Sequence, residues 1–237
     1  MKKLLVATVA LAAGVASASI VSSSVVGYNT TPTTEDTSIL IGVPFDSVDG
    51  AGFVPFSALT ATPAFENGDQ IQVAYTDNRG LTQFDVYEFD AADGWLDPSY
   101  DPCGENDGLT VGQSAWFISA GDPKTVTVSG AVKKGNIVRT FTEEGSLISS
   151  ALPMPFCPNS ERVSWGVESG DQIQVAYTDN RGLTQFDVYE YDADEGWLDP
   201  GYDPLDADAA IVGAGVGFWL IIQDTSSSFT EVSPLAE

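Results

Sequence analysis

Histidine is absent from this chain of 237 residues. Without an imidazole, a Ser-His-Asp or Cys-His catalytic arrangement and a histidine-ligated zinc site are excluded. Basic residues are scarce as well, with nine Lys and Arg against 34 Asp and Glu, and the formal net charge is −25 at pH 7. A charge of that sign repels nucleic acid and anionic membrane surfaces. We therefore expect no nucleic-acid partner, and no cofactor unless the acidic residues bind calcium.

Long apolar runs are confined to the N-terminus. Lys2 and Lys3 precede an uncharged apolar stretch at residues 4–16, and residues 16–18 (ASA) form a small-residue cleavage site. This pattern is typical of a signal peptide over residues 1–18. No later segment approaches the ~20 apolar residues of a membrane-spanning helix. We expect an exported protein without a transmembrane segment, located in the periplasm, at the cell surface or outside the cell.

Cysteine is represented only by Cys103 and Cys157. Exported chains meet an oxidising compartment, so a disulfide between these two residues is expected. It would close a loop of about 54 residues and stabilise the fold by roughly 4 kcal/mol. Two free, buried thiols are the alternative.

One segment of the chain is written twice. Residues 68–102 recur almost letter for letter as residues 170–204. The copies differ at four pairs of positions: Phe89/Tyr191, Ala92/Asp194, Asp93/Glu195 and Ser99/Gly201. Such a repeat indicates a tandem pair of units, and we expect the first at residues 19–132 and the second at residues 133–237. Because the flanks are less alike, the block reflects either recombination or one task shared by both copies.

Strand patterns dominate the chain. Ile71, Val73 and Tyr75 alternate with polar or small residues, which is the period of a half-buried strand. Residues 77–80 (DNRG) are a tight-turn cluster, and residues 84–89 return as a second strand, with a bulge where the apolar phase slips after Val86. No helical stripe of about ten residues occurs after residue 18. The sequence therefore predicts an all-β fold of two tandem homologous β-sandwich or barrel-like units.

The repeated block also holds the candidate binding residues. One set lies in its two turns: Asp77, Asn78, Arg79, Asp179, Asn180 and Arg181. The other set pairs a tryptophan with a tyrosine: Trp95 with Tyr100, and Trp197 with Tyr202. Flat aromatic rings beside carboxylates can form a platform that stacks against sugars. In the alternative interpretation, each tryptophan closes the end of a β core.

Carboxylates follow the returning strand of each copy. They are Asp90 and Asp93 in the first copy and Asp192, Asp194 and Glu195 in the second. Several carboxylates on one turn can supply the oxygen ligands of calcium, although the glycine comes one place too early for an EF-hand loop. A solvated turn is the alternative. Glycoside hydrolysis needs two carboxylates, but no pair stands out among the 34 acidic residues, so we identify no catalytic residue.

The order of motifs resembles that of uncharacterised exported tandem-repeat β proteins of Gram-negative bacteria. The first unit matches at residues 27–28 (GY), 42–45 (GVPF), 68–72 (GDQIQ), 87–95 (YEFDAADGW) and 112–117 (GQSAWF). The second unit matches at residues 170–174, 189–197 and 215–219. The resemblance implies a β-rich envelope or secreted protein and brings no catalytic residues.

These observations predict an exported, non-catalytic structural or binding protein of the cell envelope or extracellular matrix. Two equivalent faces gain avidity, by roughly 10²–10⁴, from a repetitive partner. The expected partners are other copies of the chain, cell-surface or matrix components, and glycans. A carbohydrate-binding module that uses Trp95 and Trp197, with or without calcium, is the alternative. A glycoside hydrolase based on carboxylates is the third hypothesis.

Overall fold

The computed structural model describes residues 26–32, 38–141, 145–223 and 226–235. These residues form eighteen β-strands and one short 3-10 helix, which confirms the all-β class. The expected signal peptide lies outside the described residues. Within the described ranges, no helix is both long and apolar enough to cross a membrane.

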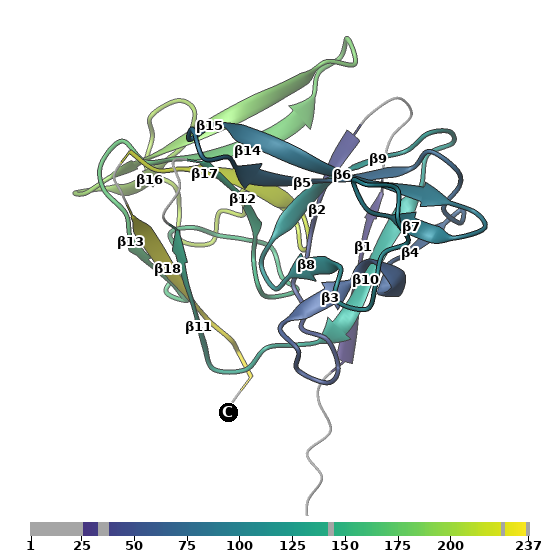
Figure 1. The fold of residues 1–237 in the computed structure, drawn as a ribbon. Helices are drawn as coiled ribbons and strands as arrows, with labels where there is room; N and C mark the ends of the chain where they lie inside the picture. Colours follow the sequence, from purple (N-terminus) through teal and green to yellow (C-terminus); the bar gives the residue numbers. More distant parts are fainter. Residues whose placement is uncertain (1–25, 33–37, 142–144, 224–225, 236–237) are drawn as a thin grey trace, which may run out of the picture.

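The first half of the chain, β1 to β10, contains three antiparallel sheets (Figure 1). The five-stranded sheet has the order β2 (Ser38–Gly42), β9 (Ser114–Ile118), β5 (Gln70–Thr76), β6 (Thr82–Asp90) and β7 (Gly94–Leu96). The three-stranded sheet has the order β1 (Val26–Pro32), β10 (Thr125–Ala131) and β4 (Thr60–Thr62). The third pairs β3 (Phe53–Pro55) with β8 (Gly108–Thr110), and the 3-10 helix η1 (Phe56–Ala58) follows β3.

The second half, β11 to β18, has the same strand order in its two sheets. The five-stranded sheet runs β12 (Gly145–Ser149), β17 (Gly217–Ile221), β14 (Gln172–Thr178), β15 (Thr184–Asp192) and β16 (Gly196–Leu198). The three-stranded sheet runs β11 (Asn136–Phe141), β18 (Ser227–Val232) and β13 (Val163–Gly166). None of these sheets closes into a barrel within the described residues. The predicted unit boundary between residues 132 and 133 stays a prediction.

The repeated block forms the same hairpin in each half. Ile71 on β5 lies opposite Tyr87 on β6, and Ile173 on β14 lies opposite Tyr189 on β15. The pairing continues without interruption through Val86, so the expected bulge is wrong. The apolar phase slips for another reason: Val86 and Tyr87 point to opposite faces of the strand, and both side chains are half-buried.

Each half has its own hydrophobic core, to which its five-stranded and three-stranded sheets both contribute. Phe117 on β9 and Val128 on β10 belong to one cluster of buried side chains. Phe218 on β17 and Phe229 on β18 belong to a second cluster. Phe218 stacks on Phe156, with ring centroids 4.9 Å apart. The two layers of each half are therefore held together mainly by apolar burial, as in a β-sandwich.

The halves meet where the ends of four strands come together. The Gly42 amide donates to the Gly215 carbonyl oxygen at 2.7 Å, and the Ser149 amide donates to the Gly112 carbonyl oxygen at 2.8 Å. Gly42 and Ser149 end β2 and β12, whereas Gly112 and Gly215 lie two residues before β9 and β17. The two hydrogen bonds are therefore equivalent. The halves pack about an approximate twofold axis, as the subunits of a dimer with an isologous interface do.

Candidate functional site

The candidate binding surface consists of the two hairpins β5–β6 and β14–β15. Their sequences are identical over residues 68–88 and 170–190, because the first of the four differences in the block comes at Phe89/Tyr191. The strands of each hairpin pair in register up to the turn, where Thr76 lies opposite Thr82. In Figure 1 the β14–β15 hairpin projects from the body of the molecule.

The turn of each hairpin is held by its first aspartate. The Oδ1 atom of Asp77 accepts hydrogen bonds from the amides of Arg79 at 2.9 Å and Leu81 at 3.0 Å, and its Oδ2 atom lies 2.8 Å from the Arg79 guanidinium. Gly80 takes the positive φ of 78° that closes the turn. The second turn repeats these contacts at 2.8, 3.0 and 2.7 Å with Asp179, Arg181 and Leu183. The predicted turn is observed, and its aspartate and arginine bind each other.

The same contacts stabilise the charged form of the turn aspartates. The Leu81 amide, the Arg79 side chain and the Arg79 amide lower the pKa of Asp77. The corresponding groups of Leu183 and Arg181 lower the pKa of Asp179. Each turn is therefore a small ordered unit at neutral pH.

Both hairpins expose large apolar side chains, and to nearly the same degree. The exposed fractions are 43% for Tyr75, 51% for Leu81 and 38% for Phe84 in the first hairpin, and 46% for Tyr177, 51% for Leu183 and 41% for Phe186 in the second. The turn residues Asn78 and Asn180 are exposed as well. Exposed side chains contribute little to the core of their own half. Packing of the core therefore does not explain why the exposed side chains of the two hairpins are identical.

Each hairpin also forms one wall of a cleft between the halves. The β5–β6 hairpin faces β11 and β12 across a cavity of about 360 Å³, and the β14–β15 hairpin faces β2 across a cavity of about 280 Å³. The hairpins contribute equivalent residues to the two clefts: Ala74, Tyr75 and Thr82, and Ala176, Tyr177 and Thr184. The opposite walls differ, with Arg139 and Phe141 in the first cleft and Trp116 in the second, although both walls contain an equivalent leucine, Leu147 or Leu40.

Arg139 connects the two halves beneath the first cleft. Its guanidinium donates to the carbonyl oxygens of Gly112 and Ser149, the latter at 2.6 Å, and lies 4.3 Å from the centre of the Phe229 ring. Glu231 lies 3.5 Å away. Burial lowers the pKa of Arg139 to about 10, against the opposing effect of Glu231, so the side chain stays protonated at neutral pH.

The structure does not support a sugar-stacking platform at the tryptophans. Trp95 is 5% exposed and Trp197 is fully buried, each within the core of its half. A buried indole offers no face to a ligand, so the core interpretation applies and the platform hypothesis is dropped. Tyr100 and Tyr202 are 71% and 68% exposed, and both have positive φ, 66° and 64°. They sit at the tips of turns and do not share a surface with the indoles.

Two of the carboxylates proposed as calcium ligands, those of Asp90 and Asp192, have a local structural role. The Oδ1 atom of Asp90 accepts hydrogen bonds from the amides of Ala92 at 2.7 Å and Asp93 at 3.2 Å. Asp192 binds the amides of Asp194 and Glu195 in the same way, at 2.8 and 3.1 Å. Over the described part of the chain, no group of three or more His, Cys, Asp or Glu residues is placed to hold a metal ion. The solvated-turn interpretation fits these contacts.

The expected disulfide is wrong, because Cys103 and Cys157 are both free. The Cys103 amide donates to the Trp95 carbonyl oxygen within the first half, whereas the Cys157 thiol points to the Asp208 carbonyl oxygen in the second half. Each cysteine therefore belongs to the packing of a different half. Burial and nearby Asp107 raise the pKa of the Cys103 thiol to about 11.

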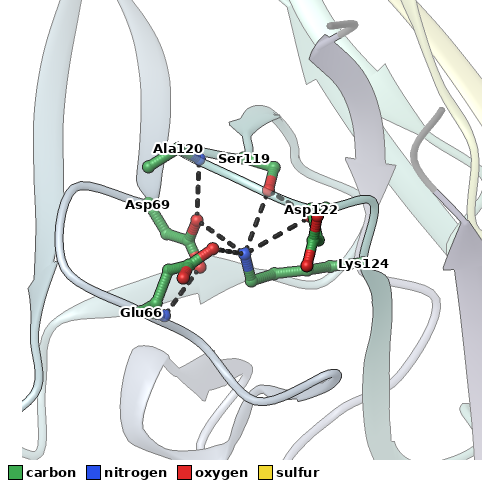
Figure 2. Close-up of polar contacts among 6 residues, drawn as sticks. All are labelled: Glu66, Asp69, Ser119, Ala120, Asp122 and Lys124. Carbon is green, nitrogen blue, oxygen red and sulfur yellow. Dashed lines mark hydrogen bonds and ion pairs between the residues drawn. The ribbon is translucent and has the colours of Figure 1, made fainter. Parts of the chain in front are cut away.

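Sequence reasoning missed a buried ion-pair cluster in the first half (Figure 2). The Nζ atom of Lys124 lies 2.6 Å from Glu66 Oε1, 3.2 Å from Asp69 Oδ1 and 3.1 Å from Ser119 Oγ. The Lys124 and Asp69 side chains are 1% and 0% exposed. The sequence offered one signal for this cluster, since Lys124 is the single basic residue between Arg79 and Lys133. The cluster ties the loop before β5 to the loop before β10.

Comparison with known proteins identifies no relative: no protein-family model, curated protein or solved structure matches the chain.

Proposed function

We propose that the protein is an exported, non-catalytic binding or structural element of the cell envelope or extracellular matrix, and that the β5–β6 and β14–β15 hairpins are its contact surfaces. The observation that carries this proposal is the matched exposure of Tyr75, Leu81 and Phe84 with their counterparts on two hairpins of identical sequence. Apolar groups exposed together on a soluble protein are typical of interaction sites.

Two equal surfaces on one chain suit a partner that presents the same site repeatedly. When both surfaces bind, the second contact is intramolecular, and the apparent affinity rises by roughly 10²–10⁴ without any new kind of contact. The turns favour such binding because Asp77 and Asp179 already order them before contact. Polymeric envelope material and arrays of the chain itself both have the required repetition.

Substitution of one hairpin at a time tests this proposal. The chain from residue 19 would be sedimented with peptidoglycan sacculi and with outer-membrane fragments of a Gram-negative bacterium, and its self-association measured by sedimentation velocity. Leu81→Ser with Phe84→Ser disables the first hairpin, and Leu183→Ser with Phe186→Ser disables the second. Each pair should weaken binding or self-association by at least roughly tenfold, and all four together should abolish it.

A matched control is Val138→Ser, since Val138 is 66% exposed on β11 and lies outside both hairpins. This variant should behave as the unsubstituted chain does. Retention of full binding by the chain with all four hairpin substitutions, or the absence of any binding and self-association in the unsubstituted chain, would contradict the proposal.

A further inference from the structure

A cavity of about 430 Å³ lies in the second half, between residues 150–157, the start of β13 and the end of β18. Its walls are largely apolar and include Leu152, Met154, Phe156 and Val163. This volume lies within the usual range for small-molecule sites. No residue of either hairpin lines it, so the cavity is separate from the proposed contact surfaces.

The lining of this cavity includes one buried carboxylate, that of Glu231. Glu231 is 2% exposed, and its Oε1 atom accepts a hydrogen bond from Ser150 Oγ at 2.6 Å. Its Oε2 atom accepts one from the Ala151 amide at 2.8 Å and lies 3.5 Å from Arg139. A buried ion pair of this kind is often no more stabilising than an apolar pair of similar volume. Glu231 is also the counter-ion of the buried Arg139, and its carboxylate forms part of the cavity wall.

The first half has no carboxylate at the corresponding place. Gly130 lies two residues after the buried Val128 on β10, as Glu231 lies two residues after the buried Phe229 on β18. A Cβ atom on Gly130 would lie 2.2 Å from the Asp46 carbonyl oxygen, so the backbone of Asp46 fills the space that a side chain would need. The carboxylate in the cavity is thus a feature of the second half and not a consequence of the shared strand order.

The charges around the cavity favour a cation. Glu161 and Asp208 line its exposed side together with Arg162, whose guanidinium points to Met154 Sδ at 3.8 Å. With Glu231, the lining holds three acidic side chains and one basic side chain, and Arg139 behind the wall offsets the charge of Glu231, which leaves one negative charge in excess. The net charge of −25 further raises the local concentration of cations and repels anions.

We propose that this cavity binds a small amphiphilic cation, a protonated primary amine on a short apolar body. The apolar body would lie against Leu152, Phe156 and Val163, and the ammonium group would donate hydrogen bonds to the carboxylates of Asp208, Glu161 or Glu231. The apolar walls exclude small hydrated metal ions, and the acidic side excludes amphiphiles such as fatty acids.

The two thiols provide a test within one molecule, because Cys157 lines the cavity and Cys103 does not. N-ethylmaleimide labelling at both positions would be followed by peptide mass spectrometry, with hexylamine, hexanol or hexanoate as the probe. Hexylamine at ten times its dissociation constant should slow labelling of Cys157 by roughly tenfold and leave Cys103 unchanged. Hexanol should protect less, and hexanoate should not protect.

Exposed residues around the cavity provide variants that spare the core. Ala207→Trp should fill the opening and remove the effect of hexylamine, while Asp208→Asn should weaken it. Ala92→Trp, at an exposed alanine in the first half, is the matched control and should keep full protection. For each variant, the labelling rate with hexylamine is divided by the rate without it. A change in the basal labelling rate of the variant therefore does not affect the comparison. Equal slowing of both thiols, no slowing of Cys157, or equal protection by hexanoate would overturn the proposal.

Discussion

Gly217 lies against Ser114 across the approximate twofold axis between the halves. A Cβ atom at position 217 would lie only 1.7 Å from Ser114 Oγ, although the two residues hold equivalent positions as the first residues of β17 and β9. In the neighbouring pair the first half supplies the glycine and the second half the serine. A Cβ atom on Gly42 would lie 2.3 Å from the Cβ atom of Ser149. Each pair has room for one side chain. Two identical halves with serine at both positions would clash, so this contact depends on the difference between the copies.

Gly217→Ala should therefore destabilise the protein by ~1–3 kcal/mol, since a methyl group cannot share this space with Ser114. Urea unfolding at 25 °C measures the loss. Ser114→Gly in the same chain should restore most of it. Alone, Ser114→Gly should have little effect, because the Ser114 hydroxyl is buried without a hydrogen-bond partner among the described residues. An unchanged urea midpoint for Gly217→Ala would show that the halves do not pack in this way.

Lys124→Met should destabilise the first half by about 2–3 kcal/mol, toward the lower end for a broken buried ion pair. The loss is limited because Glu66 is half-exposed and Asp69 keeps hydrogen bonds from the amides of Glu66 and Ala120. Asp171 has the same two backbone bonds, to Glu168 and Gln223, in the second half. Thermal unfolding followed by circular dichroism would measure the loss, and a midpoint equal to that of the unsubstituted chain would refute it.

The stabilising effect of Lys124 should also depend on pH. Burial acts to lower the pKa of Lys124, but the hydrogen bonds and charges of Glu66 and Asp69 outweigh it and raise the pKa above the ordinary 10.5. The contribution is therefore complete below pH 10.5 and is lost as the pH rises through the folded-state pKa. The difference in unfolding free energy between the unsubstituted chain and Lys124→Met should be constant from pH 7 to 10 and shrink above it. A difference that grows with pH would refute this assignment.

The two hairpin turns should loosen together in acid. Contacts from the Leu81 amide and Arg79 lower the pKa of Asp77, and the equivalent contacts lower that of Asp179, so the stabilisation is present above pH 3.8 and is lost as the pH falls through the folded-state pKa. Amide hydrogen exchange at Leu81 and Leu183, measured by NMR, should lose protection over the same pH interval after correction for the intrinsic rate. Asp77→Asn keeps a neutral oxygen acceptor and cannot titrate, so its protection should be weaker than that of the unsubstituted chain at neutral pH and should not change with pH, whereas Asp77→Ala should lose protection at every pH. Different behaviour of the two turns would contradict their equivalence.

The folded protein should contain two free thiols. The intact mass should not change on reduction, and a thiol reagent in denaturant should label two cysteines in each chain. Because burial raises the pKa of Cys103 to about 11, its labelling rate in the folded protein should still be rising at pH 10. A mass increase of two hydrogens on reduction would instead show that Cys103 and Cys157 are joined.

Local pattern was enough to predict the repeated hairpins. The alternation at Ile71, Val73 and Tyr75 reflects the period of a strand, and Gly80 supplies the positive φ of the turn. These features depend on residues close together in the chain, so they can be read without a structure. The prediction of a bulge near Val86 was wrong because it assumed that the apolar side chains of Val86 and Tyr87 lie on the same face of the strand.

The sequence by itself determined the β class, the repeated hairpin and the acidic surface, because periodicity, turn chemistry and charge are local or summed properties of the chain. Only the tertiary structure decided that Trp95 and Trp197 are buried, that Cys103 and Cys157 belong to different halves, and that Lys124 meets Asp69. Each of these depends on which distant segments come into contact. The same holds for Gly217 and Ser114, whose fit arises only when the two halves pack about their axis.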